Sequence, residues 1–240
     1  MNSIALGSVW MRKMFDSVPE KYNRLNRILT FGQDEIWRQK ALDAIEAEDG
    51  TAILDICTGP GNLAIKIAGK FPNSKVYAVD LSSRMVAAAK ERAMRLGLQN
   101  IIFKEDDCLH MEFANEHFDY ITISFGFRNL SYSIANLKAA LKEMYRVLKD
   151  DGKLVIIETS QPANALARNI FHLYAGKIVP RLGKLFSGHR EPYAYLGASI
   201  VKFFNQEKVI DILKAQGFHI KRRSAYLFGG VTLCVFQKKS

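Results

Sequence analysis

The chain is poor in cysteine and has no long apolar run. Its three cysteines, Cys57, Cys108 and Cys234, are far apart and odd in number, which fits neither a disulfide framework nor paired metal ligands. No apolar run approaches the roughly 18 residues that a membrane-spanning helix needs, and the beginning of the chain lacks the basic-then-apolar order of a secretion signal. We therefore interpret the cysteines as small buried residues and expect a cytoplasmic location.

The composition excludes two further classes of protein. Hydrophobic residues make up 48% of the 240 residues and charged residues 24%, close to the averages of globular proteins, so neither disorder nor a fibrous repeat is indicated. This length suits one well-buried α/β domain and is short for two independent domains. We expect a single domain over residues 1–240.

The formal net charge is +10. A basic surface attracts polyanions such as nucleic acid, anionic lipid headgroups or acidic proteins. Charge alone does not choose among these partners, and a basic enzyme without any of them also remains open.

Short β-branched runs alternate with helical stretches over residues 51–158, which is typical of a parallel sheet with helices on both faces. Ser82 and Gly97 mark the beginning and end of one helix. Apolar residues at helical spacing predict another over Leu137–Leu148, ended by Asp150-Asp151-Gly152. The strands that the sequence predicts are Ala52–Ile56, Lys75–Asp80, Asn100–Phe103, Phe118–Phe125 and Lys153–Thr159.

The segment Phe218–Phe236 contains two extended runs around residues 226–230, without room for a crossover helix. We expect this last pair of strands to be antiparallel. Doubly wound folds bind ligands at the carboxyl edge of the sheet, which segments outside the core could cover. The expected division is a helical cap over 1–50, a cofactor-binding core over 51–160, a helical insertion over 163–217 that faces substrate or membrane, and terminal strands over 218–240.

A glycine turn follows the first predicted strand. Gly59 and Gly61 let the backbone turn sharply and approach a ligand closely. The run Gly59-Pro60-Gly61-Asn62-Leu63-Ala64 also satisfies a dinucleotide-binding pattern, so a nicotinamide enzyme and a purely structural turn stay open at this point.

Acidic residues at three successive strand ends favour an adenosyl sulfonium ligand. Asp55 would meet the ammonium group of a methionine moiety, whereas a pyrophosphate would be repelled by that charge. Asp80, about 20 residues after the glycines, would accept the ribose hydroxyls. Asp107 would accept the adenine amino group, and Cys108 would supply a backbone N–H. The pair Asp106-Asp107 could instead belong to a solvated loop.

Further motifs along the chain resemble the ubiquinone/menaquinone biosynthesis C-methyltransferases, which are class I S-adenosylmethionine-dependent methyltransferases. The resemblance spans nearly the whole chain. It rests on Phe15-Asp16-Ser17-Val18, the segment Gly32 to Trp37, Thr122-Ile123-Ser124-Phe125-Gly126-Phe127-Arg128-Asn129-Leu130, Tyr145-Arg146-Val147-Leu148-Lys149, Glu158-Thr159-Ser160-Gln161-Pro162 and Tyr193-Ala194-Tyr195-Leu196.

The resemblance implies a doubly wound, mostly parallel seven-stranded sheet with an antiparallel last strand. It implies S-adenosylmethionine as cofactor, no metal, and methylation of demethylmenaquinol to menaquinol; the alternative is the 2-polyprenyl-methoxy-benzoquinol of ubiquinone biosynthesis. The cofactor contacts it implies are Gly59, Gly61, Asp80, Asp107, Cys108 and Ser124, beside Asp55.

The chain departs from the family pattern at three places, of which Asp150 and Asp151, in place of the usual proline and glycine, are a neutral change of turn. Pro60 stands where the family usually has threonine, which removes a hydroxyl and a backbone N–H from the methionine end of the site, so that Thr58 is expected to take over the contact. Asp34 and Glu35 stand where a histidine and a basic residue are usual, so substrate recognition is expected to differ if this pair touches substrate.

The reaction needs a positive charge near a ring oxygen. Ring carbon is a poor nucleophile, and ionising the neighbouring phenol, with a reference pKa of about 10, moves electron density onto it. We expect Arg128 to stabilise the phenolate and Asn129 to orient the ring. Tyr22 is a further candidate, although Tyr22 and Asn26 could simply form a packed helix face.

A polyprenyl tail holds the substrate in the bilayer at about 0.8 kcal/mol per methylene, so the enzyme must reach the membrane. Residues 165–186 repeat apolar side chains near helical spacing, with Arg168, Lys177, Arg181 and Lys184 among them. We expect peripheral binding to anionic lipid at the inner face of the membrane. An ordinary helix packed on the sheet would show the same amphipathicity.

Three rival interpretations remain. The charge suggests nucleic-acid modification, but Ser124-Phe125-Gly126 differs from the motif of base-amino methyltransferases and no basic-aromatic patch stands out, so we expect no nucleic-acid partner. A nicotinamide oxidoreductase and a non-catalytic module that has lost turnover through Pro60 are the other two. A homo-oligomer is possible, and the sequence does not decide it.

Overall fold

A computed structural model describes residues 3–17, 19–188 and 190–239. Its centre is a seven-stranded sheet with the order β3-β2-β1-β4-β5-β7-β6. The strands β1 to β5 run parallel to one another, and β7 is antiparallel to both β5 and β6. Their bounds are β1 Ala52–Ile56, β2 Lys75–Asp80, β3 Ile101–Glu105, β4 Phe118–Ser124, β5 Leu148–Thr159, β6 Phe218–Tyr226 and β7 Val231–Lys238.

The predicted antiparallel end of the sheet is confirmed. Between β6 and β7 lies only the short 3₁₀ turn Leu227–Gly229, too short for a parallel crossover. The prediction that β5 begins at Lys153 was wrong, because its pairing with β4 starts at Leu148 and continues through a register shift. Asp151, with φ of 60°, allows the chain to turn there without ending the strand.

Successive side chains of a strand point to opposite faces of the sheet. Since consecutive strand residues are buried here, both faces are covered by helices. Ile53 lies in one apolar cluster with α3 (Gln33–Leu42) and α4 (Asn62–Lys70). Leu54 lies in the other, with α7 (Ile134–Val147) and α11 (Gln206–Lys214). The helix α5 (Ser83–Arg95) packs against β2 and β3, and the Ser82 hydroxyl caps it as expected, accepting the N–H of Met85.

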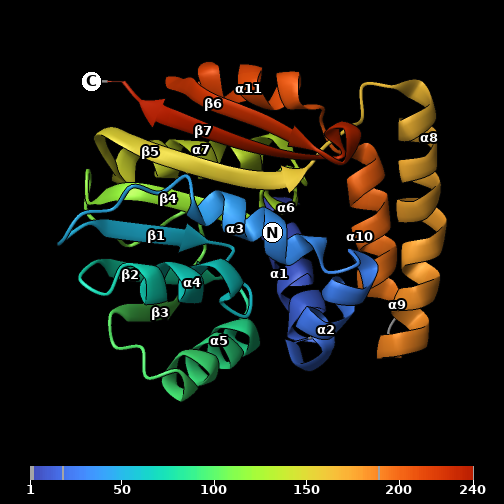
Figure 1. Cartoon of the computed structure of the whole chain (residues 1–240), viewed down its shortest axis with the longest axis horizontal. Helices are drawn as coiled ribbons and strands as arrows, with labels where there is room; N and C mark the ends of the chain where they lie inside the picture. Colours follow the sequence, from blue (N-terminus) through green and yellow to red (C-terminus); the bar gives the residue numbers. More distant parts are fainter. Residues whose placement is uncertain (1–2, 18, 189, 240) are drawn as a thin grey trace.

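The remaining helices gather beyond the carboxyl ends of the parallel strands (Figure 1). They are α1 (Ser3–Asp16), α2 (Pro19–Leu29), the short α6 (Phe127–Leu130), α8 (Ala165–Leu173), the π-helical turn Tyr174–Ile178, α9 (Val179–Ser187) and α10 (Glu191–Lys202). Most of the described residues within 1–50 and 163–217 are helical, as expected, whereas residues 43–50 and the short connections between the helices are not. Of the helices described, none has both the length and the apolar character to cross a membrane.

Candidate active site

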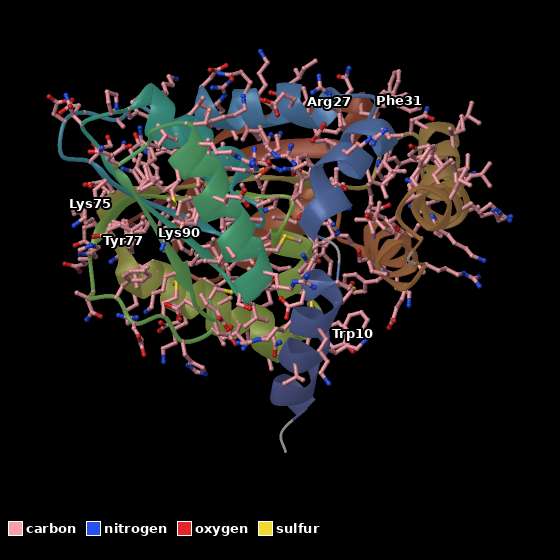
Figure 2. All side chains as sticks on the ribbon, turned by 90° about the horizontal axis from the view of Figure 1, so that it is seen from below. Trp10, Arg27, Phe31, Lys75, Tyr77 and Lys90 are labelled. Atoms are coloured by element: carbon pink, nitrogen blue, oxygen red, sulfur yellow. The ribbon has the colours of Figure 1, made fainter. Side chains whose placement is uncertain are left out.

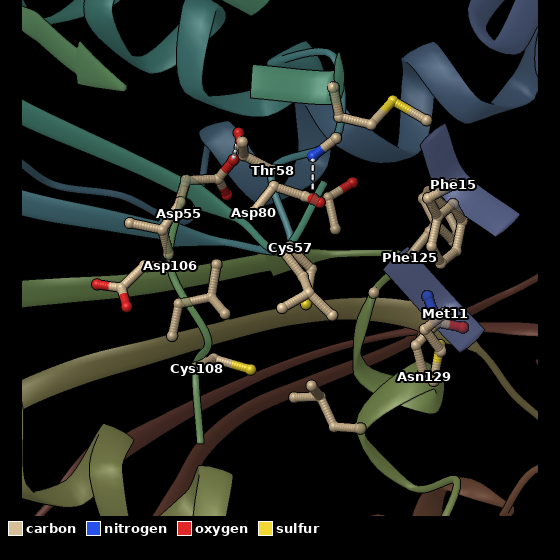
Figure 3. Close-up of a pocket in the computed structure, with 18 of the residues that line it drawn as sticks. Met11, Phe15, Asp55, Cys57, Thr58, Asp80, Asp106, Cys108, Phe125 and Asn129 are labelled. Carbon is tan, nitrogen blue, oxygen red and sulfur yellow. Dashed lines mark hydrogen bonds between the residues drawn. The ribbon is translucent and has the colours of Figure 1, made fainter. Parts of the chain in front are cut away.

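A cavity opens at the carboxyl ends of β1, β2 and β4, beneath α1 (Figure 3). Its wall includes the predicted residues Asp55, Thr58, Gly59, Asp80, Asp107, Cys108 and Ser124. Met11 and Phe15 of α1 close one side. Because the parallel strands all point to this edge, residues far apart in the sequence meet here.

The glycine turn serves the cavity through its backbone. Gly59 has φ of 56°, and its N–H donates to Asp80 Oδ2 at 2.8 Å. Gly61 does not line the cavity; it precedes α4 with φ of 76°, and a Cβ there would lie 3.0 Å from Ala89 Cβ. Gly61 thus allows the turn, and its predicted contact with a cofactor stays a prediction. Pro60 is anchored through its carbonyl, which accepts a hydrogen bond from Arg92.

The carboxylate of Asp80 is held at the tip of β2. Its Oδ1 accepts the N–H of Ser82 at 2.9 Å, opposite the bond from Gly59 to Oδ2. Burial raises the pKa of Asp80, and the bonds from Ser82 and Gly59 partly oppose this rise. The two backbone donors fix the orientation of a carboxylate that borders the cavity, as recognition of a diol requires.

Asp55 lies deeper, at the end of β1, and is 1% exposed. It accepts hydrogen bonds from the hydroxyls of Thr58 at 2.6 Å and Thr122 at 2.5 Å. Burial raises the pKa of Asp55 to about 6, and the two hydroxyls oppose that rise. Thr58 was expected to contact a cofactor directly. Its hydroxyl instead donates to Asp55 and so helps to position that carboxylate.

The loop after β3 supplies the third acidic landmark. Asp107 Oδ1 accepts the N–H of Leu109 at 3.0 Å, and Asp106 Oδ1 accepts the N–H of Asp107 at 2.9 Å. These local bonds shape the loop and leave Asp106, Asp107 and Cys108 on the cavity wall. Both aspartates are partly buried, so their place on the cavity wall favours the cofactor interpretation over a solvated acidic loop.

Two observations test whether these residues fit S-adenosylmethionine. The Ser124 hydroxyl is buried on the cavity wall and has no hydrogen-bond partner among the residues described, so a ligand there would satisfy it. A Cβ at Gly126 would lie 2.4 Å from Cys57 Cβ, so only glycine preserves this part of the wall. The wall also offers carboxylates that can accept hydrogen bonds from ribose hydroxyls and from an ammonium group, so the residues present fit the cofactor.

A second cavity adjoins the first. Its volume is about 1990 Å³, including its open mouth, against about 1040 Å³ for the first, and most of its wall is apolar. α2, α3, α8, α10 and the β6–β7 turn contribute side chains. Arg38 and Phe125 line both cavities, so they form the wall between them.

The predicted catalytic residues lie at this junction. Arg128 lines the second cavity and Asn129 the first, on adjacent positions of α6. Arg128 is buried and donates to Glu158 Oε1 at 2.6 Å and to the Ser199 hydroxyl at 3.1 Å. Asn129 Oδ1 accepts from the hydroxyl of Tyr195 at 3.3 Å. The side chain of Tyr22 lies outside the described residues.

Sequence reasoning missed three residues of the site. Phe125 stands inside a motif that was recognised and Arg38 directly follows the segment Gly32 to Trp37, but nothing in their spacing indicated a shared wall. Glu158 forms an ion pair with Arg128 from 30 positions away, and the pairing of β4 with β5 brings them together. Within the described part of the chain, no cluster of histidine, cysteine, aspartate or glutamate could hold a metal ion.

Comparison with known proteins agrees with this arrangement. A sequence model of the ubiE/COQ5 methyltransferase family matches residues 4–238. A demethylmenaquinone methyltransferase of Porphyromonas gingivalis is 37% identical over 215 residues, covering 89% of this chain and 84% of that protein. A ubiquinone/menaquinone biosynthesis C-methyltransferase UbiE of Geotalea uraniireducens is 36% identical over 235 residues, covering 95% of this chain and 96% of that protein.

Solved structures with the same fold include a SAM-dependent methyltransferase from Aquifex aeolicus. It superposes with a TM-score of 0.58 at 22% identity, over 83% of this chain and 88% of that one. At this identity the likeness shows the fold, a class I methyltransferase sheet with helices on both sides.

Proposed function

The chain belongs to the ubiE/COQ5 methyltransferase family, and from this premise we propose that it transfers a methyl group from S-adenosylmethionine to a ring carbon of demethylmenaquinol. Relatives named demethylmenaquinone methyltransferase support the naphthoquinol. A relative whose name spans both pathways keeps the 2-polyprenyl-methoxy-benzoquinol as a second candidate. The observation that carries the proposal is the large apolar cavity that meets the cofactor cavity at Arg38 and Phe125.

The second cavity suits a ring with an apolar tail. Trp37, Phe125 and Ile200 provide flat or branched apolar surface near the junction, and Leu166, Ile170 and Phe171 line the part nearer α8. The ring would lie at the junction, where Arg128 offers polar contact, and the first isoprene units would follow the apolar wall outward. Burial of each methylene contributes about 0.8 kcal/mol, so the tail supplies binding energy far from the reacting carbon.

S-Adenosylmethionine, when bound, supplies a methyl group on a sulfonium, which is electrophilic without any metal. We propose that Asp80 holds the ribose hydroxyls, that Asp107 and Cys108 contact the adenine, that Ser124 contacts the cofactor at the end of β4, and that Asp55 faces the ammonium group. These residues would fix the cofactor so that the methyl faces the junction. Holding both reactants in line supplies about 7 kcal/mol or more of the barrier.

Arg128 is the residue we propose to stabilise the phenolate form of the substrate. Its partner Glu158 also accepts the N–H and hydroxyl of Thr159, at 2.7 and 2.9 Å, and the N–H of Arg128 at 3.1 Å. Since the carboxylate charge is shared among these donors, the guanidinium is only partly neutralised. No described residue accepts a hydrogen bond from Arg128 Nη2, which leaves a donor for the ring oxygen.

Asn129 is proposed to orient the ring beside Arg128. The hydroxyl of Tyr195 donates to its side-chain oxygen, which leaves its amide N–H groups for the substrate. Burial raises the pKa of Tyr195 to about 12, so this tyrosine stays protonated and is a poor candidate for the base. Water remains our candidate for removing the phenol proton.

We further propose that the protein docks on anionic membrane around the mouth of the second cavity. Three separate segments place exposed apolar side chains on its wall: Phe31 (81% exposed), Leu166 and Ile170 of α8, and Leu227 and Phe228 of the β6–β7 turn. We call these five residues the apolar rim. Figure 2 shows Phe31 and Arg27 pointing outward at the end of α2. A rim of this kind would enter the bilayer and admit the tail directly.

The activity is tested by incubating the enzyme with isotopically labelled S-adenosylmethionine and demethylmenaquinol in vesicles. We expect one added methyl on a ring carbon, identified by mass spectrometry of the quinone fragment. Arg128→Gln should lower kcat by about 10²- to 10³-fold, since one donor to a developing oxyanion is lost, and leave the affinity for S-adenosylhomocysteine within about threefold. A methyl ether product, or better turnover of the benzoquinol, would refute the naphthoquinol assignment.

Vesicle flotation tests the apolar rim. The double variant Phe31→Asp, Phe228→Asp should lose most binding to vesicles that contain anionic lipid, because two charges would have to enter the interface. The matched control is Met94→Asp, an exposed apolar residue of α5, which should float like the wild type. Equal flotation of all three proteins would show that this rim is not the docking surface.

A further inference from the structure

The charges around the cofactor cavity are unbalanced. Four carboxylates line it, those of Asp55, Asp80, Asp106 and Asp107, and among the described lining residues only Arg38 carries a positive charge. The amino-acid end of S-adenosylmethionine carries an ammonium group and a carboxylate. The acidic side chains suit the ammonium group and the sulfonium, but they would repel the carboxylate. Arg38 is thus the one lining side chain with the charge that this carboxylate needs.

Arg38 is held in a fixed orientation by its own helix. One turn earlier on α3, Asp34 Oδ2 accepts a hydrogen bond from Arg38 Nη1 at 2.5 Å, and both side chains are buried. The hydroxyl of Thr30 donates to the other oxygen of Asp34 at 2.9 Å. The guanidinium also lies over the ring of Phe125, 5.4 Å from its centroid. These contacts hold the plane of the guanidinium in place.

The guanidinium keeps donors available for a ligand. Arginine has five N–H donors, and in the described part of the chain the side chain of Arg38 makes a single hydrogen bond, the one to Asp34. Since Arg38 lines both cavities, its remaining donors have access to either of them. Asp55, which carries the opposite charge, also lines the cofactor cavity. The cavity wall therefore offers one partner for each charge of an amino-acid group.

We propose that Arg38 binds the carboxylate at the methionyl end of the cofactor, and that Asp34 is the positioning residue that aims the guanidinium. Asp55 and Arg38 together then recognise the two charges of the amino-acid group. This inference rests on the methyltransferase activity of the family and is independent of the quinol proposed above.

The same geometry explains the acidic pair after Gly32. Asp34, which stands where the resembling enzymes usually have histidine, serves Arg38 and lines the second cavity. Glu35 is exposed and pairs with Lys66 at 2.6 Å, outside both cavities. Of this acidic pair, only Asp34 therefore lines a cavity, and Glu35 offers a control on the same helix.

Calorimetric titration with two ligands tests the proposal without using any quinol. The first ligand is S-adenosylhomocysteine, and the second is its decarboxylated analogue, which keeps the adenosine, the thioether and the amine. The wild type should bind the analogue about 10- to 100-fold more weakly, the range expected for a charge-assisted hydrogen bond. Equal affinities in the wild type would overturn the proposal before any variant is made.

The variants then assign this difference to Arg38. Arg38→Gln should weaken S-adenosylhomocysteine binding by about 10- to 100-fold and change the affinity for the analogue by less than about threefold. Arg38→Lys should bind S-adenosylhomocysteine with an affinity between those of the wild type and Arg38→Gln. Lysine keeps the positive charge but lacks the paired N–H donors of the guanidinium. Asp34→Asn should weaken S-adenosylhomocysteine selectively, and Glu35→Gln should change neither affinity.

Three results would refute the assignment. Equal losses for both ligands in Arg38→Gln and Arg38→Lys would mean that Arg38 supports the cavity wall and not the carboxylate. If Arg38→Gln leaves the affinity for S-adenosylhomocysteine unchanged but raises the KM for quinol, the guanidinium of Arg38 binds the substrate and not the cofactor. A loss of both ligands in Asp34→Asn, with an unaltered melting temperature, would remove Asp34 as the positioning residue. Absence of quinol methylation would leave the titration results unaffected, because no titration involves the quinol.

Discussion

At the scale of single residues, Asp55 carries two opposing effects. Burial disfavours its charge, whereas hydrogen bonds from Thr58 and Thr122 favour it, and the balance raises its pKa to about 6. A cationic ligand beside it would favour the charged form further. The side chain is therefore poised near the lower end of the physiological range in the free protein, and cofactor binding is expected to draw a proton from it at mildly acidic pH.

The raised pKa of Asp55 predicts that the affinity for the cofactor depends on pH. As the pH falls through about 6, Asp55 becomes protonated in the free protein and loses its attraction for the ammonium group. The dissociation constant for S-adenosylhomocysteine should rise between pH 7 and 5, by at most about tenfold per pH unit below 6. Calorimetry over this range measures it, and Asp55→Asn should bind weakly with a flatter profile. A wild-type profile that matches the variant would contradict the assignment.

The same shift predicts the stability of the free protein. Since the folded-state pKa lies above the value of 3.8 for an ordinary aspartate, the contribution of Asp55 to stability is fully present below about pH 4 and is lost as the pH rises through 6. Asp55→Asn removes this loss, so the variant should be more stable than the wild type at pH 7, by about 1–3 kcal/mol. Denaturant unfolding at pH 7 and pH 5 checks this, and the gap should narrow at the lower pH.

At the scale of elements, α10 approaches α9 and the π-helical turn closely, through two glycines. A Cβ at Gly183 would lie 2.2 Å from the ring of Tyr193, and one at Gly197 would lie 2.1 Å from the carbonyl oxygen of Ala175. The second contact is with backbone, which cannot rotate away. These helices line the second cavity but contribute no residue to the wall of the first, so their packing should affect one ligand and spare the other.

Gly197→Ala tests this separation. The added methyl should push α10 away from the π-helical turn, destabilise the protein by about 1–3 kcal/mol, and raise the KM for quinol several-fold. The affinity for S-adenosylhomocysteine should stay within about twofold. Gly176→Ala, where the nearest atom to the new Cβ is 3.8 Å away, is the matched control and should leave both KM and melting temperature almost unchanged. Parallel losses of both ligands would mean that the two cavities are not independent.

At the scale of the whole molecule, the net charge of +10 and the apolar rim favour the same partner. Exposed basic residues of the cap helices include Arg27 of α2, Lys177 of the π-helical turn, and Arg181 and Lys184 of α9. Each such charge near an anionic surface contributes about 1 kcal/mol, and this attraction decays within a Debye length. The apolar contribution of the rim is not screened by salt.

Salt should therefore separate the two contributions to membrane binding. We expect sedimentation with vesicles that contain anionic lipid to fall steeply as the ionic strength rises from about 0.05 to 0.5 M. Vesicles of neutral lipid should bind weakly, with little dependence on salt. Binding that survives high salt unchanged on both kinds of vesicle would assign attachment to apolar contacts alone.

The sequence by itself determined the strand-helix alternation, the antiparallel end of the sheet and the acidic residues at its carboxyl edge. Those features depend on side chains a few positions apart, such as the cap at Ser82 and the glycine turn after β1. Three strands, β1, β2 and β4, were predicted within one residue of their observed bounds, whereas β3 and β5 were not. Their limits depend on which residues of a neighbouring strand are available for pairing.

Only the tertiary structure decided which of these residues share a wall. Arg38 lies against Phe125, Arg128 pairs with Glu158, and Phe31 lines the same cavity as the β6–β7 turn, although these residues are between 30 and about 200 positions apart. No local pattern encodes such contacts, because they arise when the parallel strands align their carboxyl ends and the cap helices close over them. The sequence therefore determines which functional groups lie at the edge of the sheet. The division into two cavities, and the partners that the guanidinium groups of Arg38 and Arg128 find in other segments, follow from packing.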